Sequence, residues 1–281
     1  MTDAELHQRG FFVVPALLDS DAVCALRDEL SGRFVAAGSP RFLRFSQLQA
    51  SPSLMQLPFR EPLVRRLRQA LGADYFTVPD LCAQHDMYGV WHADSDPDGP
   101  HLALQREHFR VVKCGIYLQD NAAGGGGLEV IPGAHRLPMR WAPPRMAYAC
   151  KALRDRLLRP LRRVRVPLRA GDALVFDYRL PHVSARPLAG QQAREKYVLY
   201  FNASASESAS HYLEHMQRRA VREEHKGGEV FWSDALRRNY PEDFPAAFIH
   251  AAESAQARVL VPPCDEVFKW RNWYQAVATS S

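Results

Sequence analysis

The residues with the clearest chemical potential are His92 and Asp94, which stand two positions apart in the chain. They lie in a predicted strand over residues 87–94, and side chains at positions i and i+2 of a strand point to the same face. An imidazole and a carboxylate on one face can bind one metal ion. His182, which follows the apolar run 173–176, is the candidate for a third ligand. Two histidines and one carboxylate on one face of a metal ion leave its other positions open, which is the arrangement of non-haem Fe(II) oxygenases.

Other histidines fit a metal site less well. His85 and Asp86 are adjacent, so in a strand their side chains point to opposite faces. His211 and His215 would share one face of a helix, but they lack the glutamate of a His-Glu-x-x-His motif. We interpret this second pair as solvated. A His-x-Asp pair is common in proteins, so the metal assignment depends on what surrounds it.

The composition is that of an ordinary globular protein of 281 residues, with 47% hydrophobic and 24% charged residues. The N-terminus lacks the basic and then apolar pattern of a signal peptide, and no apolar run reaches the roughly 18 residues of a membrane span. Five cysteines are scattered without a Cys-x-x-Cys pair, so a disulfide framework is not expected. We therefore predict a protein of the reducing cytoplasm.

The net charge of +5 is unevenly distributed, because arginines are concentrated between residues 154 and 169. The simplest interpretation is a solvated helix face that keeps the protein dispersed in water. An anionic substrate, a membrane surface and a nucleic acid are the alternatives. Nucleic acid is the weakest of these, because aromatic residues are not interleaved with the arginines as a stacking platform would require.

Short apolar runs separated by turn residues dominate the chain from residue 75 onward. Their spacing predicts strands near 75–84, 87–94, 110–119, 127–131, 164–168, 173–177 and 195–202. Many short strands are typical of a sandwich or barrel, so the predicted fold class is mainly β with flanking helices.

Helical patterns flank this β region. A short helix over 4–10, a strand-like run over 11–14 and helices over 20–30 and 61–71 are expected before it. We predict one domain over the whole chain. Its parts are N-terminal helices in 1–74, a β core at about 75–203 with insertions at 95–109 and 136–163, and a helical extension at 204–281.

Four blocks of the sequence resemble, in the same order, the phytanoyl-CoA dioxygenase-like family of Fe(II)/2-oxoglutarate oxygenases. They are Gln-Arg-Gly-Phe-Phe-Val-Val-Pro at 8–15, Trp-His-Ala-Asp at 91–94, the segment 116–135 that ends in Pro-Gly-Ala-His, and the segment 171–194 from Gly-Asp-Ala-Leu to an arginine. Each block is weak alone, whereas the ordered combination is specific. The resemblance implies a double-stranded β-helix core, a relative of the jelly roll.

The resemblance further implies that His92, Asp94 and His182 hold Fe(II), with 2-oxoglutarate and O2 as co-substrates. Related halogenases carry a small residue at the carboxylate position, which leaves room for chloride. Because Asp94 is present here, the resemblance favours hydroxylation or desaturation over halogenation.

The far carboxylate of 2-oxoglutarate needs a basic partner, and the position that matches the family arginine is Arg194. A guanidinium suits this role because it can form two parallel hydrogen bonds with a carboxylate. Arg186 is a rival, and Lys196 is a weaker one. Lys113 is expected on a strand beside the metal, where an inward side chain would need an anionic partner such as 2-oxoglutarate or the substrate, which makes it a candidate for cofactor binding, and an outward one would be solvated. Gln84 is a further candidate for the lining of this pocket and for contact with 2-oxoglutarate.

The function predicted from these residues is oxidation of a small molecule, with decarboxylation of 2-oxoglutarate to succinate and CO2. The substrate is expected between the mouth of the β core and the insertions, where loops set specificity. Biosynthetic tailoring and acyl-CoA hydroxylation are both open, and an anionic substrate would suit the arginines. The alternatives are a non-catalytic β-helix protein that binds a metal or ligand, and an oxygenase that modifies nucleic acid or protein. The sequence does not predict an oligomeric state.

Overall fold

The structure is a computed structural model that describes residues 2–95, 109–121, 126–137, 144–187, 195–213, 215 and 245–260. Its helices are α1 (Thr2–Arg9), α2 (Ser20–Ala36), α3 (Phe45–Leu48), α4 (Pro52–Met55), α5 (Glu61–Leu71), α6 (Pro144–Arg162) and α9 (Ala246–Ser254). Single turns of 3-10 helix are η1 (Leu57–Phe59), η2 (Ala134–Arg136) and η3 (Ser206–Ser208).

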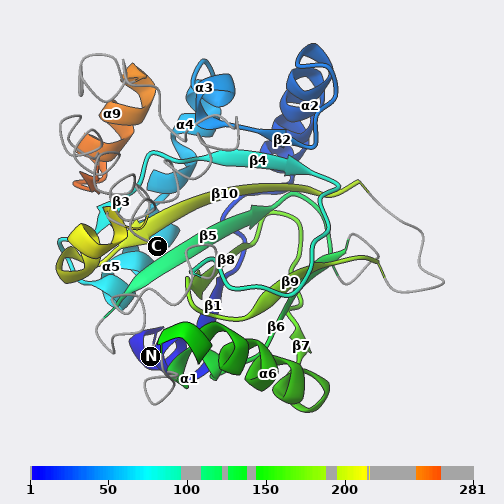
Figure 1. The fold of residues 1–281 in the computed structure, drawn as a ribbon. Helices are drawn as coiled ribbons and strands as arrows, with labels where there is room; N and C mark the ends of the chain where they lie inside the picture. The colour runs from blue at the N-terminus through cyan, green and yellow to red at the C-terminus, as the bar shows by residue number, and fades with distance from the viewer. Residues whose placement is uncertain are drawn as a thin grey trace, which may run out of the picture.

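The strands form two sheets. They are β1 (Phe11–Val14), β2 (Phe42–Leu43), β3 (Phe76–Thr77), β4 (Cys82–His85), β5 (Val111–Tyr117), β6 (Gly127–Val130), β7 (Val164–Arg165), β8 (Ala173–Asp177), β9 (His182–Ala185), β10 (Tyr197–Ser204) and β11 (Arg258–Val259). The larger sheet has the order β1-β8-β5-β10-β3-β11, with β4 also paired to β10 and β2 paired to β4. The smaller sheet has the order β7-β6-β9 (Figure 1).

The space between the two sheets is filled by side chains from both. Phe11, Leu174 and Phe176 of the larger sheet pack in one buried cluster with Leu128 and Val130 of the smaller sheet. Two facing sheets with a shared apolar interior make a sandwich of the jelly-roll type. The predicted fold class, a mainly β core with flanking helices, is confirmed.

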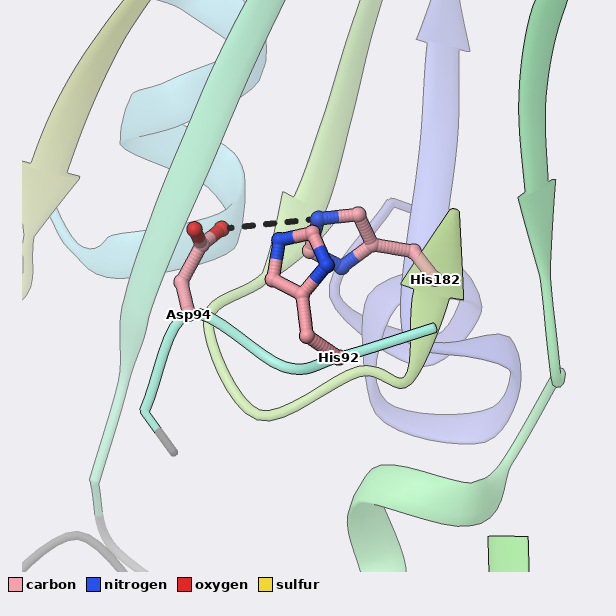
Figure 2. Close-up of side chains that lie close together, drawn as sticks. All are labelled: His92, Asp94 and His182. Atoms are coloured by element: carbon pink, nitrogen blue, oxygen red, sulfur yellow. Dashed lines mark ion pairs between the residues drawn. The ribbon is translucent and has the colours of Figure 1, made fainter. Parts of the chain in front are cut away.

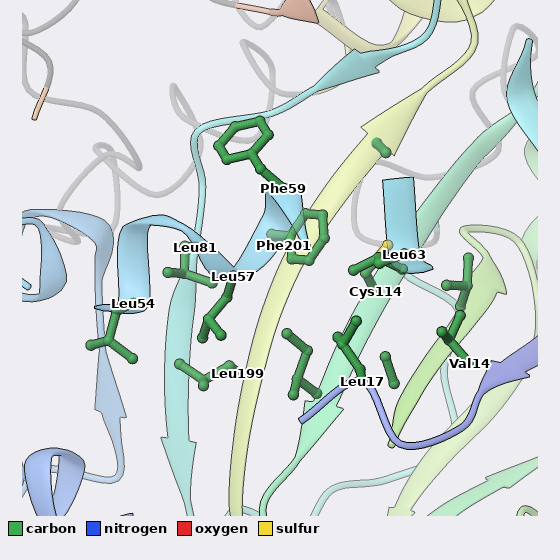
Figure 3. Packing of buried hydrophobic residues seen from close by; sticks show 14 of the residues in the cluster. Val14, Leu17, Leu54, Leu57, Phe59, Leu63, Leu81, Cys114, Leu199 and Phe201 are labelled. Atoms are coloured by element: carbon green, nitrogen blue, oxygen red, sulfur yellow. The ribbon is translucent and has the colours of Figure 1, made fainter. Parts of the chain in front are cut away.

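The other face of the larger sheet is covered by helices. Figure 3 shows Leu57, Phe59 and Leu63 from the segment η1–α5 beside Leu199 and Phe201 of β10. Leucine and phenylalanine side chains each contribute about 1.5–3 kcal/mol when fully buried, so this layer fixes the helices on the sheet. The helices thereby leave the opposite face of the sheet free to form the interior of the sandwich.

The helix ends follow from local chemistry. Asp19 caps α2 by accepting a hydrogen bond at Oδ1 from the Ala22 amide, at 2.8 Å. Helix α5 runs over the predicted residues 61–71 and ends at Gly72, whose φ of 107° lies where only glycine is unstrained.

The structure differs from the predicted strands at several points. The predicted strand 75–84 is divided into β3 and β4, and β9 was not predicted. No regular strand covers residues 87–94, where His92 forms only an isolated bridge with His182. The sheet also extends outside residues 75–203, because β1 pairs with β8 and β11 pairs with β3. The isolated pair at His92 and the two-residue β11 have too short a hydrophobic pattern for sequence analysis to detect, whereas β1 covers the strand-like run predicted over 11–14.

The arginine-rich insertion contains α6, which lies beside the smaller sheet and away from α2 and α9 (Figure 1). The prediction that 136–163 is partly helical is therefore confirmed. The predicted insertion at 95–109 falls almost entirely outside the described residues. Among the helices that the structure describes, none combines the length and hydropathy that a membrane crossing requires.

Candidate metal centre

Two backbone hydrogen bonds hold His92 and His182 opposite each other. The His92 amide donates to the His182 carbonyl at 3.0 Å, and the His182 amide donates to the His92 carbonyl at 2.8 Å. The two residues form an antiparallel bridge, so their side chains lie on the same side, with ring centroids 4.4 Å apart. Figure 2 shows both rings next to the carboxylate of Asp94. The fold thus brings together residues that are ninety positions apart in the chain.

Each histidine ring is oriented by a backbone carbonyl. The distance from Nδ1 to a carbonyl oxygen is 2.8 Å for His92, at Val90, and 2.9 Å for His182, at Leu180. A neutral imidazole that donates from Nδ1 presents its Nε2 lone pair to a ligand. Metal-binding histidines are commonly oriented by such a hydrogen bond from the second ring nitrogen.

Asp94 completes the group with a carboxylate whose two oxygens have different surroundings. Oδ1 accepts a hydrogen bond from Lys113 Nζ at 2.9 Å. Oδ2 is buried without a hydrogen-bond partner among the described residues, and it lies 3.8 Å from His182 Nε2. A buried carboxylate oxygen without a partner is costly, because its lost contacts with water are not replaced. A cation between Oδ2 and the two imidazoles would replace them.

The charges of these groups suit a metal site. Burial alone would raise the pKa of Asp94, but Lys113 and the two histidines outweigh it and hold this pKa well below its usual value. Burial lowers the pKa of His182 to about 4, and the neighbouring Asp94 opposes this effect only in part. At neutral pH the carboxylate is therefore ionised and the imidazole of His182 is neutral, which are the states that bind metal ions.

One ligand atom from each of His92, Asp94 and His182 can be chosen so that all three lie within 4.8 Å of one another. Asp94 and His182 are buried, whereas His92 is exposed, so the group is open on the side of His92. A nitrogen and oxygen ligand set of this kind with an open side fits Fe(II).

Lys113 points into the sandwich. Along β5 it shares a face with Tyr117, which packs in the cluster between the sheets. Its Nζ pairs with Asp94 and lies 5.3 Å from the centroid of the Tyr200 ring, whose hydroxyl is 3.1 Å from that of Tyr117. The sequence left both directions open for Lys113, and the structure has the inward one, with Asp94 as its described anionic partner. Its predicted contact with 2-oxoglutarate or the substrate stays a prediction.

Gln84 lies on the same inner face. It is half-buried in β4 opposite Val198 of β10, which packs between the sheets. No hydrogen bond joins Gln84 to the described metal-site residues. Its predicted role in lining the pocket stays a prediction.

The candidates for the far carboxylate of 2-oxoglutarate have different settings. Arg194 lies outside the described residues. Arg186 is exposed after β9, with its guanidinium carbon 5.2 Å from the centroid of the Tyr88 ring. Lys196 is 1% exposed, and it donates from Nζ to Ser184 Oγ and, at 3.3 Å, to the Met87 carbonyl.

Lys196, which the sequence analysis ranked as the weaker rival, is a buried cation. Burial lowers its pKa to about 8, with Asp86 opposing this effect only in part, and the described hydrogen-bond partners of Nζ carry no negative charge. It lies two positions before Val198, so it shares the inner face of β10. Its burial could not be foreseen, because a lysine between the charged residues 194–195 and a strand is most often exposed.

Three other groups were interpreted from the sequence. His85 stacks on Tyr197, with ring centroids 4.5 Å apart, and it does not belong to a possible metal-binding group among the described residues. His215 is fully buried, with Nε2 3.4 Å from the Tyr178 hydroxyl, so its interpretation as a solvated residue was wrong. Its helical surroundings gave no apolar pattern that would indicate burial. His211 is half-buried.

Comparison with known proteins decides the family. The family model described as phytanoyl-CoA dioxygenase matches residues 6–195, which is more than half of the chain. The chain belongs to the phytanoyl-CoA dioxygenase family. The predicted family is thus confirmed, and the matched region includes the three candidate ligands, Lys113 and Arg194.

A curated relative is the ectoine dioxygenase of Streptomyces avermitilis, which is 27% identical to this family member over 144 residues. The match covers 45% of this chain and 48% of the relative, so the chain spans about half the length of that relative.

Solved structures share the fold at low sequence identity. The enzyme EctD from S. alaskensis with 2-oxoglutarate and 5-hydroxyectoine has a TM-score of 0.55 and 18% identity, covering 73% of this chain and 76% of EctD. HygX from Streptomyces hygroscopicus with nickel and 2-oxoglutarate has a TM-score of 0.52 and 19% identity, covering 72% and 84%. The epimerase SnoN from nogalamycin biosynthesis has a TM-score of 0.51 and 18% identity, covering 73% and 81%.

Proposed function

We propose that this protein is an Fe(II)/2-oxoglutarate-dependent dioxygenase that hydroxylates or desaturates a small molecule. In hydroxylation, one oxygen atom of O2 enters the substrate and the other enters succinate, which forms from 2-oxoglutarate with release of CO2. The observation that carries the proposal is the buried, unpartnered Oδ2 of Asp94 beside two imidazoles whose Nδ1 atoms are engaged by carbonyls. Membership of the phytanoyl-CoA dioxygenase family supports it.

The role that we propose for each residue of the site follows from its contacts. His92, Asp94 and His182 would hold the iron, which supplies the activation of O2 when bound. Lys113 fixes Asp94 through Oδ1, so that the second oxygen faces the imidazoles. Burial of Asp94 and His182 keeps water from that side, whereas exposed His92 leaves the other side open to substrate.

The far carboxylate of 2-oxoglutarate would bind a cation near the start of β10. Arg194 is the candidate implied by the family resemblance. Lys196 is a rival with support in the structure, because it is a buried cation on the inner face whose Nζ forms its described hydrogen bonds with uncharged groups only. Arg186 is the weaker rival, because its side chain is exposed.

A role in biosynthetic tailoring is supported by the kinds of protein that share the fold. EctD was solved with 5-hydroxyectoine and SnoN comes from nogalamycin biosynthesis, both of which concern small metabolites. Hydroxylation of an acyl-CoA, as in the name of the family, is the second candidate, because basic residues of α6 would suit its phosphates. We retain a cytoplasmic location and a single domain as predictions.

The decisive test is spectroscopic. Fe(II) and then 2-oxoglutarate are added without oxygen to metal-free protein, and the weak visible charge-transfer band of a keto acid chelated to iron is measured. The wild type should develop the band, and His182→Ala should not. His85→Ala is a matched control, because this histidine lies outside the metal group, and it should keep the band.

Turnover completes the test. His92→Ala and Asp94→Ala should lose decarboxylation of 2-oxoglutarate while circular dichroism shows a folded chain. A folded wild type that never develops the band would contradict the proposal, and a non-catalytic β-helix protein would then be the better description.

A further inference from the structure

A cavity of about 400 Å³ lies directly beside the exposed ligand His92. On one side the cavity is lined by Trp91, His92 and Pro181. Trp91 and Pro181 are the residues directly before the ligands His92 and His182. On the other side the cavity is lined by α6. Small-molecule sites have volumes of roughly 300–1,000 Å³, so this cavity has the size of a metabolite site.

The cavity carries an excess of positive charge. Its charged lining residues are Lys151, Asp155, Arg156 and Arg159. The one carboxylate among them is already engaged, because Asp155 accepts hydrogen bonds from Lys151 Nζ at 2.8 Å and from Arg154 at 2.7 Å. Asp155 therefore does not neutralise the two arginines.

Arg156 and Arg159 have no ion pair with any carboxylate that the structure describes. Arg156 is exposed, and Arg159 is half-buried, with its guanidinium carbon 6.0 Å from the centroid of the Trp91 ring. The positions i and i+3 place the two arginines on one face of α6. Two guanidinium groups on one face can bind a carboxylate or a phosphate through paired hydrogen bonds.

We propose that the substrate of this enzyme is a small anion whose carboxylate or phosphate binds Arg156 and Arg159 while its oxidised carbon lies near His92. The ring of Trp91, which lines the same cavity beside Arg159, would pack against the carbon skeleton. This inference rests on the proposed function. It assigns the arginines that line the cavity to substrate binding, whereas Arg162 and Arg163 do not line it and Arg163 instead lies 4.0 Å from Glu129.

The test compares probes that share a chain and differ in the head group. Octanoate, octyl phosphate and the uncharged octanamide are titrated into metal-free protein by isothermal calorimetry. Wild type should bind at least one of the two anions about tenfold or more tightly than octanamide, because charged hydrogen bonds to guanidinium are lost with the amide. The stronger of the two anions then identifies the head group as a carboxylate or a phosphate.

The variant Arg156→Gln/Arg159→Gln should lose this preference for the anion and keep its weak binding of octanamide. The matched control is Arg162→Gln, which removes an exposed arginine from the same helix outside the cavity and should bind as the wild type does. Equal binding of anion and amide by wild type, or undiminished anion binding by the double variant, would overturn the proposal.

The same proteins separate this inference from the proposed function. The double variant should still form the charge-transfer band with Fe(II) and 2-oxoglutarate, because its metal ligands are intact. If wild type binds the anions through the two arginines but never forms the band, the oxygenase assignment fails and the anion site stands. If the band forms but anion binding does not depend on the arginines, only the substrate class fails.

Discussion

At the scale of single residues, the metal centre depends on the different contacts that the two carboxylate oxygens of Asp94 make. One oxygen is fixed by Lys113, and the other is left for a metal ion. The lysine is 19% exposed and has no other described carboxylate beside it, so the two residues compensate each other's burial. A lysine beside a metal ligand would repel the metal if the carboxylate did not lie between them.

Replacing Lys113 by methionine tests whether its hydrogen bond orients the Asp94 carboxylate for metal binding. Lys113→Met keeps the length of the side chain and removes the hydrogen bond that orients Asp94. We expect Fe(II) to bind about tenfold more weakly, since loss of a group that orients a metal ligand commonly has this effect. The requirement for 2-oxoglutarate at saturating iron should stay the same. Unchanged iron affinity together with a raised requirement for 2-oxoglutarate would instead make Lys113 a direct partner of the co-substrate.

The partner of the far carboxylate is also decided by single residues. Arg194→Ala should raise the apparent requirement for 2-oxoglutarate by about tenfold or more, because a charge-assisted pair is lost. Lys196→Met should raise it less, since Lys196 already donates to Ser184 and Met87. Steady-state decarboxylation assays at varied 2-oxoglutarate measure both. The reverse order of effects would give the role to Lys196, and an effect of neither would give it to Arg186.

At the scale of elements, the site depends on the close approach of β5 and β10 at Gly115. A Cβ atom at this position would lie 2.7 Å from the ring of Tyr200, which is closer than carbon atoms pack. Tyr200 in turn faces Lys113 and bonds to Tyr117 through its hydroxyl group. The glycine is therefore what allows these two tyrosines to pack between the sheets.

Gly115→Ala should lower the free energy of unfolding by about 1–3 kcal/mol, as overpacking of a core does. Gly32→Ala is the matched control, because Gly32 lies within α2 and a Cβ there would meet no atom within 4 Å. This control should raise stability by roughly 0.5–1 kcal/mol, the helix propensity difference. Urea unfolding measures both variants. A Gly115→Ala protein as stable as the wild type would show that Tyr200 moves without cost.

Elements with a long periodic pattern could be predicted from the sequence, and isolated contacts could not. The leucine stripe of α5 and the apolar run of β8 each carry enough residues to define a period, and both elements lie where they were predicted. The bridge between His92 and His182 is one residue long, so nothing in the local sequence marks it. The three metal-site residues were predicted from their types and spacing together with the family resemblance, whereas the carbonyls that orient the rings depend on the fold alone.

At the scale of the whole molecule, two apolar layers lie on either side of the larger sheet. One joins the sheet to the helices, and the other fills the sandwich, where Phe176 packs against His182 with ring centroids 4.8 Å apart. The direction of Lys113 and the burial of Lys196 follow from which layer each strand faces. This direction depends on the register between strands that are distant in the sequence, so local patterns left it open.

The free energy of unfolding should depend on pH through the protonation of His182. Its pKa is about 4 in the folded protein and about 6.5 when unfolded. The folded state thus binds fewer protons between these two values, and stability is lost as the pH falls from about 6.5 towards 4. The difference of about 2.5 pKa units corresponds to roughly 3 kcal/mol in the metal-free protein. Above pH 6.5 both states are neutral at this residue, so its contribution is then complete.

Other groups titrate in the same range, among them His135, whose pKa is also lowered, mainly by burial. The measurement is therefore a difference between wild type and His182→Asn, each freed of metal and unfolded in urea at pH 7, 5.5 and 4. The wild type should lose more stability than the variant over this range, by about 3 kcal/mol, because only its side chain at this position must be kept neutral on folding. Parallel pH profiles for the two proteins would mean that His182 is already accessible to protons in the folded state, which contradicts its burial beside Asp94.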